Sequence, residues 1–232
     1  MIGVMFGNKH SYRDFGLILS SKTIPLPKPK TDLINVPGAD GSIDLSTVLT
    51  DGDVKYENRS ITCKFTVIDP IKNWETVKSK LANYLHGQRM HVIFDVDKGF
   101  YYDGRCTIDP WSEKKRTGSL TVKINADPYK YDVQDSTEDW IWDTFNFETG
   151  IIQSCKNVSV EDGTVLTIPS KRMKVVPVIT VDQNVDVTFE GVRYQLTAGN
   201  NTYLSIQFTE GENELTFHGT ATVTITFRGG SL

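Results

Sequence analysis

The second half of the sequence repeats one pattern: short runs in which apolar and polar residues alternate, each followed by a turn. Three of the turns are Glu190-Gly191, Gly199-Asn200-Asn201 and Glu210-Gly211. Because successive side chains of a strand point to opposite faces, each run predicts a strand with one buried face. Short strands with turn signals every ~8–12 residues are typical of a β-sandwich. The predicted strands span residues 175–181, 185–189, 192–196, 204–208, 215–217 and 221–227.

The first half predicts another β-rich domain. Ile61, Cys63, Phe65 and Val67 alternate with polar residues, as in a strand that buries one face. Pro128 cannot continue a central strand, so a domain boundary is expected near it, and we draw it between residues 132 and 133. Further strands are predicted at residues 15–19, 90–96, 101–108 and 120–124.

One helix is predicted, from Asp69 to Gly87. Asp69 suits the N-cap, Pro70 the first helical position and Gly87 the C-cap. Apolar residues recur at helical spacing and predict a buried stripe, formed by Ile71, Trp74, Val77, Leu81, Tyr84 and Leu85. The predicted fold class is therefore mainly β: an N-terminal β-barrel-like α+β domain with one helix, residues 1–132, followed by a β-sandwich, residues 133–232.

A loop rich in glycine joins two strand-like segments near the N-terminus. Its sequence is Val36-Pro37-Gly38-Ala39-Asp40-Gly41-Ser42-Ile43-Asp44-Leu45, and Asp40-Gly41 is a strong turn dipeptide. The stretch before it holds Pro25, Pro27 and Pro29, which favour an extended segment outside a sheet ladder. We interpret that stretch as a surface connector, and the alternative is an arm that reaches a neighbouring molecule.

Composition and charge exclude several classes of protein. The chain has 232 residues and a net charge of −4, with 38% hydrophobic and 23% charged residues, as in ordinary globular proteins. Residues 1–135 carry 19 Lys+Arg against 17 Asp+Glu, and residues 136–232 carry 6 against 12. No basic stripe of the kind that nucleic-acid binders use is present. Neither an apolar run long enough to span a membrane nor a secretion signal is present.

The search for reactive residues predicts no enzyme, metal or cofactor. Cys63, Cys106 and Cys155 are widely spaced, which favours free, partly buried thiols in a protein made in a reducing compartment. The histidines and cysteines lack metal-ligand spacing, and no nucleophile, zinc or phosphate-loop motif occurs. The acidic residues Asp135, Glu138, Asp139 and Asp143 form a cluster, which we interpret as a charged, solvated segment.

Several motifs resemble one family, the distal tail (Dit) proteins of long-tailed, siphovirus-type bacteriophages. They are His10-Ser11-Tyr12-Arg13-Asp14-Phe15-Gly16-Leu17, the glycine-rich loop at 36–45, the strand at 61–68, the helix at 69–87 and Ala126-Asp127-Pro128-Tyr129. The ending Val223-Thr224-Ile225-Thr226-Phe227-Arg228-Gly229-Gly230 is similar to that of the family's galectin-like sandwich. The loop departs from the family at Ala39, where a basic residue is expected. The resemblance follows the order of nearly the whole chain.

The resemblance implies a structural role without enzymatic activity. In this family six copies form a ring at the distal end of the tail tube through their N-terminal domains, and DNA passes through its hole. The ring joins the tail tube protein to the tail-tip protein, and the galectin-like domains carry receptor-binding proteins in many members. The resemblance thus implies a homo-hexameric virion protein of the tail tip or baseplate that takes part in host adhesion. It would be made in the host bacterial cytoplasm and would bind neither a membrane nor nucleic acid stably.

The alternative interpretation is a carbohydrate-binding module that contacts host cell-wall sugars. Trp140-Ile141-Trp142 and Phe145-Asn146-Phe147 make residues 133–172 rich in aromatic rings, and such rings stack on sugars. Trp140 and Trp142 are the candidate carbohydrate contacts. Aromatic residues in this pattern are more often core or interface residues, which favours the structural role. A cell-wall hydrolase is the least favoured class.

Overall fold

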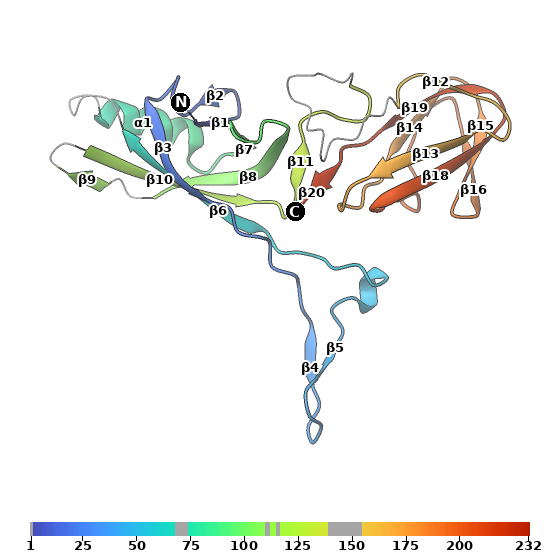
Figure 1. The fold of residues 1–232 in the computed structure, drawn as a ribbon, viewed down its shortest axis with the longest axis horizontal. Coiled ribbons are helices and arrows are strands. Elements are labelled where there is room, and N and C mark those ends of the chain that lie inside the picture. Colours follow the sequence, from blue (N-terminus) through green and yellow to red (C-terminus); the bar gives the residue numbers. More distant parts are fainter. Residues whose placement is uncertain (1, 68–73, 110–111, 115–116, 139–154) are drawn as a thin grey trace. The chain divides into compact units, whose positions relative to one another are not determined.

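The protein is described by a computed structural model that covers residues 2–67, 74–109, 112–114, 117–138 and 155–232 (Figure 1). The chain forms two compact units. The first comprises Met1–Asp97, Tyr102–Lys130 and Leu232, and the second comprises Lys98–Tyr101 and Tyr131–Ser231. Strands dominate both units, and the described residues contain a single α-helix. The predicted class, mainly β with one helix, is confirmed.

One antiparallel sheet forms the frame of the first unit. Its strands follow the spatial order β2-β1-β7-β8-β10-β6-β3, and β9 pairs with β10. The strands are β1 (Val4–Phe6), β2 (Lys9–His10), β3 (Leu17–Thr23), β6 (Arg59–Val67), β7 (Arg89–Phe94), β8 (Phe100–Ile108), β9 (Ser112–Lys114) and β10 (Thr117–Ala126). β3 and β2 are therefore the two edge strands of this path.

The alternation predicted for residues 61–67 is confirmed in β6. Ile61, Cys63, Phe65 and Val67 are buried, and the residues between them face outward. β6 pairs with β10 on one side, where Phe65 lies opposite Leu120, and with β3 on the other. This strand thus contributes a continuous apolar row to the core of the first unit.

The helix α1 (Trp74–Leu85) packs into the same core. Trp74, Val77, Leu81 and Leu85 are its buried residues, and they join the apolar row of the sheet in one cluster. Gly87 has a φ of 78°, a left-handed value that glycine adopts at low cost, so it ends the helix as predicted. The predicted start at Asp69 and Pro70 lies outside the described residues.

Between β3 and β6 the chain forms a projection that we call the arm, residues 24–58 (Figure 1). The arm contains β4 (Leu33–Asn35), β5 (Ser42–Asp44) and the 3-10 turn η1 (Val48–Thr50). β4 and β5 pair only with each other and form a separate two-stranded sheet. The glycine-rich stretch therefore contains β5 and the tip of this hairpin, in agreement with the predicted turn.

Two four-stranded antiparallel sheets form the second unit. Their orders are β12-β19-β14-β17 and β13-β18-β15-β16. The first contains β12 (Val158–Val160), β14 (Val178–Val181), β17 (Gly199–Asn201) and β19 (Ala221–Thr226). The second contains β13 (Val165–Ser170), β15 (Val185–Phe189), β16 (Val192–Leu196) and β18 (Gly211–His218). Their inward-facing residues share one apolar cluster, as the predicted sandwich requires.

A short ladder lies beside the sandwich in the same unit. β11 (Lys130–Asp132) pairs with β20 (Gly230–Ser231) and with the first residues of β8, where Tyr131 lies opposite Tyr101. The rings of Tyr131 and Tyr101 stack with their centroids 5.4 Å apart. This ladder was not predicted, because strands of two or three residues have too few positions to show an alternation.

The predicted strand at residues 204–208 is wrong. The backbone N–H of Ile206 donates to the carbonyl oxygen of Tyr203 at 3.1 Å, which bends this segment into a turn. Phe208 makes only an isolated bridge with Val175, so the predicted strand at 175–181 is also shorter and begins at Val178. Ile206 and Phe208 are nonetheless buried, so their alternation reports burial rather than a strand ladder.

Candidate interaction surface

A short ladder at the base of the arm holds its two ends together. Pro29 and Tyr56 form an isolated antiparallel bridge. Beside it, the N–H of Lys30 donates to the carbonyl oxygen of Lys55, and the N–H of Glu57 donates to that of Lys28, each at 2.8 Å. The proline-rich stretch is therefore one side of a paired base, which fixes where the arm leaves the sheet.

A buried arginine secures the strand that returns from the arm. Arg59, the first residue of β6, is 3% exposed and donates from Nη2 to the carbonyl oxygen of Pro128. Its guanidinium carbon lies 5.4 Å from the ring centroid of Tyr102, a cation–π distance. Burial lowers the pKa of Arg59. The ring of Tyr56 packs edge-on against the ring of Tyr129, the residue that follows Pro128, so the base of the arm is tied to the segment that follows β10.

The hairpin of the arm has a defined register. Leu33 pairs with Asp44 and Ile34 with Ile43, so the two isoleucines lie side by side on one face. At the tip, Gly38 has a φ of 83°, a value that side chains other than glycine rarely adopt. A Cβ atom there would meet no atom within 4 Å, so the backbone angle rather than crowding requires glycine.

The arm exposes apolar side chains that a free monomer would be expected to bury. Ile34 and Ile43 are 47% and 54% exposed, and Leu49 in η1 is 96% exposed. The exposed large hydrophobic residues of the arm are Leu26, Leu33, Ile34, Val36, Ile43, Val48 and Leu49. Elsewhere in the described part of the first unit they are only Ile2, Tyr12 and Val96. Such a concentration indicates a surface that another molecule covers.

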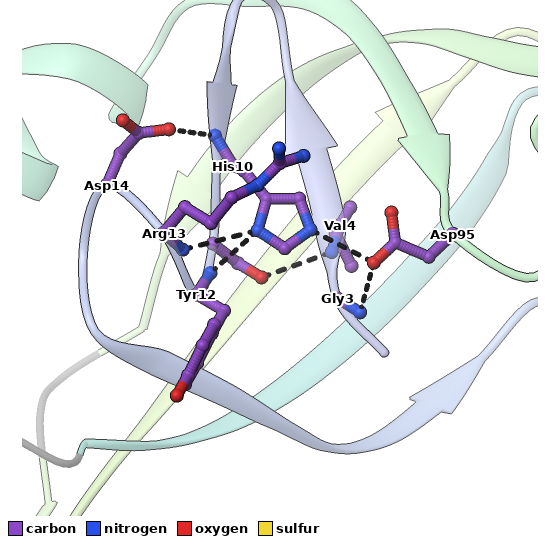
Figure 2. A network of polar contacts seen from close by, with 8 residues as sticks. Gly3, Val4, His10, Tyr12, Arg13, Asp14 and Asp95 are labelled. Carbon is purple, nitrogen blue, oxygen red and sulfur yellow. Dashed lines mark hydrogen bonds and ion pairs between the residues drawn. The ribbon is translucent and has the colours of Figure 1, made fainter. Parts of the chain in front are cut away.

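A polar network at the N-terminus involves a buried histidine (Figure 2). His10 is 3% exposed, and its Nδ1 accepts hydrogen bonds from the backbone N–H groups of Tyr12 and Arg13 at 3.2 and 3.3 Å. The ring proton of the neutral imidazole therefore lies on Nε2, which is 3.0 Å from Oδ2 of Asp95. The same Oδ2 accepts from the N–H of Gly3 at 2.7 Å. The network thus ties β1 and β2 to the end of β7.

The network has the residue types of a Ser-His-Asp triad but not its geometry. Ser11 Oγ is buried and accepts from the N–H of Val4 at 3.1 Å. Both ring nitrogens of His10 already have partners, so the ring has no nitrogen left to accept a proton from a nucleophile. A Cβ atom on Gly3 would come within 2.5 Å of the His10 ring, so the backbone of Gly3 packs directly against that ring. The network therefore holds these segments together without the hydrogen-bond arrangement of a triad.

The three cysteines are free and buried. Burial raises the pKa of Cys63 and of Cys106 to about 12, and that of Cys155 to about 11. The thiolate is the reactive form, so these cysteines are poor nucleophiles and poor metal ligands at neutral pH. No group of three or more His, Cys, Asp or Glu residues that could hold a metal ion occurs within the described ranges.

The remaining predicted site residues fall partly outside the described residues. Trp140 and Trp142 lie there, as do Asp139 and Asp143 of the acidic cluster. Asp135 accepts hydrogen bonds from Thr137, which together with Arg228 lower its pKa, against the opposing effect of burial. In the part of the second unit that the structure describes, each aromatic side chain is buried or half-buried. None of the described helices is both long and apolar enough to cross a membrane.

Sequence reasoning missed the residues that make the arm a candidate interaction surface. Leu33, Ile34 and Ile43 look like ordinary strand residues, which are usually buried. The available signal was the combination of three prolines with a glycine-rich turn, which suits a hairpin outside the main sheet. The exposure of its apolar residues became visible only in three dimensions.

No protein-family model matches the sequence, and no curated protein matches it either. Among solved structures, the chain is similar to the Dit protein (gp19.1) of SPP1, which is described as a paradigm of the hub adsorption apparatus in phages that infect Gram-positive bacteria. The match has a TM-score of 0.65 and 11% sequence identity, and it covers 98% of this chain and 99% of that chain. The two proteins therefore share one fold over their full lengths, and the likeness expected from the sequence motifs is confirmed at the level of the fold.

Proposed function

We propose that this protein is a structural hub of the tail tip, or baseplate, of a long-tailed phage. The observation that carries the proposal is the shared fold with SPP1 Dit, which includes both units and leaves almost no residue of either chain unmatched. A match that was limited to one unit would be compatible with many functions, because single β folds host many of them. An arrangement of two particular β-rich units in one order is a stronger constraint.

In this proposal six copies form a ring through the N-terminal domain, residues 1–132. The exposed apolar side chains of the arm supply the contact area that a stable interface needs. β3, an edge strand, offers an unpaired backbone edge at the same unit. A closed ring would cover both features, and closure also limits further growth by edge pairing.

The ring joins the tail tube protein to the tail-tip protein and lets DNA pass. The C-terminal domain, residues 133–232, is a galectin-like sandwich that carries receptor-binding proteins and so contributes to host adhesion. The protein acts in the virion without enzymatic activity. Two observations on the described residues support this role. The cysteines are buried and unreactive, and both ring nitrogens of His10 are already engaged in hydrogen bonds.

The test is the mass of the purified protein in solution together with negative-stain electron microscopy. We expect rings with a central hole and a mass of six times 26.1 kDa. If the protein alone remains monomeric, the same measurement is repeated with the tail tube and tail-tip proteins of the same phage. A chain that forms no ring in any of these mixtures would contradict the proposal. In that case a glycan array with Trp140→Ala and Trp142→Ala variants would test the carbohydrate-binding alternative.

A further inference from the structure

A lysine and an aspartate meet in an enclosed position beside the short ladder of the second unit. Nζ of Lys171, the residue that follows β13, lies 2.5 Å from Oδ1 of Asp132 in β11. The two side chains are 15% and 21% exposed. In the pair of Lys123 and Asp109, by contrast, Nζ and Oδ2 are 2.9 Å apart and the lysine is 49% exposed. The pair of Lys171 and Asp132 is therefore closer and less accessible to water than an ordinary surface ion pair.

Apolar atoms and bare main chain enclose this pair. Nζ of Lys171 lies 4.7 Å from the centre of the Phe100 ring, and Phe100 is itself buried. The main chain of Gly229 packs against the carboxylate so closely that a Cβ atom there would overlap Oδ2 of Asp132. A Cβ atom on the next glycine would likewise come within 2.9 Å of the sulfur atom of Met173. Both glycines therefore permit a close packing here that a side chain would prevent.

Among the residues that the structure describes, neither side chain of the pair has a second hydrogen-bonding or ion-pairing partner. The guanidinium of Arg228 donates to the main-chain carbonyl oxygens of Asp132 and Val133 and pairs with Asp135, rather than with the Asp132 carboxylate. Charges withdrawn from water are costly unless further hydrogen bonds satisfy their remaining protons and lone pairs. A reaction that removes both charges would therefore stabilise this enclosed position.

We propose that Lys171 and Asp132 join in an isopeptide bond, a covalent modification of the second unit. A proton first passes from Nζ to Oδ1 along their hydrogen bond and leaves a neutral amine beside a carboxylic acid. Nζ then attacks Cγ of Asp132, the new C–N bond forms, and the hydroxyl group departs with a second proton from Nζ as water. The –NH₃⁺ and –COO⁻ groups thus become –NH–CO– and one water molecule, without an oxidant, a cofactor or a change in net charge.

Two physical effects favour the reaction at this position. The fold holds the amine against the carboxyl group, which replaces an encounter in solution by a step within one molecule. The ring of Phe100 and the main chain of Gly229 limit the access of water, and water is the reactant that would hydrolyse the bond. The bond would fasten β11, whose ladder with β20 consists of strands of two or three residues, to the end of β13.

The test is the intact mass of the purified full chain, after the folded protein has been incubated for days at neutral pH. We expect a mass that is lower than the sequence mass of 26.1 kDa by one water molecule. Lys171→Arg keeps the positive charge, but its guanidinium stays protonated and cannot attack the carboxyl group, so this variant should have its full sequence mass. Lys123→Arg is the matched control at an exposed ion pair, and it should still lack one water molecule.

Peptide mapping locates the bond. Trypsin cuts after lysine and arginine, so the cross-link should join the peptides 131–156 and 157–172. A single uncut peptide 131–172 has the same mass, but only the joined product has two N-termini, so fragment ions separate the two products. The same fragment ions distinguish the cross-link from a succinimide, in which an aspartate loses water by reacting with its own main chain.

The bond should also stabilise the second unit, because it closes a loop between residues that are 39 apart in the sequence. We expect the melting temperature of Lys171→Arg to be roughly 10 °C lower than that of the wild type, and that of Lys123→Arg to be unchanged. Folded wild-type protein of full sequence mass would overturn the inference, as would a loss of water that lies elsewhere or persists in Lys171→Arg. The wild-type mass and fragment ions decide the inference even if Lys171→Arg does not fold, and they do so independently of whether rings form.

Discussion

Asn201 and Asn213 close two different turns of the second unit with the same set of hydrogen bonds. The amide nitrogen of Asn201 donates to the carbonyl oxygens of Thr197, Gly199 and Ile179 at 2.8, 3.0 and 3.3 Å. Its Oδ1 accepts from the N–H of Thr197 at 3.0 Å. Ile179 is also the residue opposite Asn201 in the pairing of β14 with β17. One buried side chain therefore closes the turn and holds it to the neighbouring strand.

Asn213 repeats this arrangement in the other sheet. Its amide nitrogen donates to the carbonyl oxygens of Thr209, Gly211 and Ile168 at 2.9, 3.3 and 3.1 Å, and its Oδ1 accepts from the N–H of Thr209 at 2.9 Å. Ile168 lies opposite Asn213 in β13 and β18. The two turns share the pattern Thr-x-Gly-x-Asn, in which the glycine has a positive φ.

Replacing Asn213 by alanine should lower the free energy of unfolding of the second unit by about 2–3 kcal/mol. The change removes hydrogen bonds worth about 1 kcal/mol each and leaves buried main-chain carbonyl groups without a donor. Asn201→Ala should cost a similar amount, because its partners are equivalent. Urea unfolding followed by fluorescence or circular dichroism measures both.

Asn200→Ala is the matched control for these two variants. Asn200 is exposed, and its Oδ1 accepts only from the hydroxyl of Thr180, at 2.8 Å. We expect a loss below about 0.5 kcal/mol, as for most surface substitutions. A loss at Asn213 as small as that at Asn200 would show that the buried hydrogen bonds do not hold the turn.

The sequence predicted turns in these two regions, but it did not predict the asparagine hydrogen bonds that close them. Glycine marks a turn by its backbone freedom, and Gly199 and Gly211 do have a positive φ. The predicted turn at residues 199–201 is wrong in its position, because these residues form β17 and the bend lies just before them, and Gly211 likewise already belongs to β18. The role of Asn213 depends on Ile168, 45 residues away, and no local pattern shows such a partner. The wrong strand at 204–208 has the same origin, since alternating burial of Ile206 and Phe208 arises from the packing of a loop on the core.

In the candidate interaction surface, too, local sequence patterns do not show what each residue contacts. The loop at residues 36–45 predicts a sharp turn because Gly38 needs a positive φ. Whether Ile34 and Ile43 are buried or exposed depends on what lies beside the hairpin, and their sequence pattern is the same in both cases. The long-range order of motifs indicated the fold where individual motifs could not, because several weak signals in one order constrain the arrangement jointly.

His10 should be a neutral imidazole protonated at Nε2. Its Nδ1 accepts from two backbone N–H groups, and its Nε2 faces the Asp95 carboxylate. In protein labelled with 15N, nuclear magnetic resonance should show the chemical shift of an unprotonated nitrogen at Nδ1 and of a protonated one at Nε2. Asp95→Ala removes the acceptor for Nε2 and for Gly3 and should lower the stability of the first unit by about 1–3 kcal/mol. A proton on Nδ1 would contradict the hydrogen-bond network of Figure 2.

The three cysteines should make the protein less stable in alkali. In the unfolded chain a thiol deprotonates with an ordinary pKa near 9.0, whereas burial holds Cys63 and Cys106 protonated up to about 12 and Cys155 up to about 11. Between these values the folded state binds more protons than the unfolded state, so the free energy of unfolding falls as pH rises, by up to about 1.4 kcal/mol per thiol and pH unit.

The checks are thiol labelling and unfolding curves. At pH 8 a disulfide reagent such as Ellman's reagent should label none of these thiols on the timescale of seconds, and should label all three in denaturant. Unfolding curves at pH 8, 9 and 10 should show the loss of stability. Cys106→Ala should make that loss smaller, although the substitution itself costs packing energy at every pH. Rapid labelling of the native protein would show that a thiol is not buried.

Replacing the isoleucine pair of the arm should separate assembly from folding. Ile34→Ser/Ile43→Ser removes apolar side chains that are already half exposed in the free chain, so the melting temperature should change by no more than a degree or two, as for surface substitutions of about 0.5 kcal/mol. The loss of binding free energy in an interface between copies should be far larger, because covering the exposed area of two isoleucines contributes roughly 2 kcal/mol.

The control is Val165→Ser/Val192→Ser in the second unit, where the two valines have similar exposure, and this variant should assemble normally. Light scattering and electron microscopy measure the rings, and differential scanning calorimetry measures the fold. Rings formed by the arm variant at wild-type concentrations would show that the arm is not buried between copies, whereas a large drop in melting temperature would show that it is already packed in the monomer.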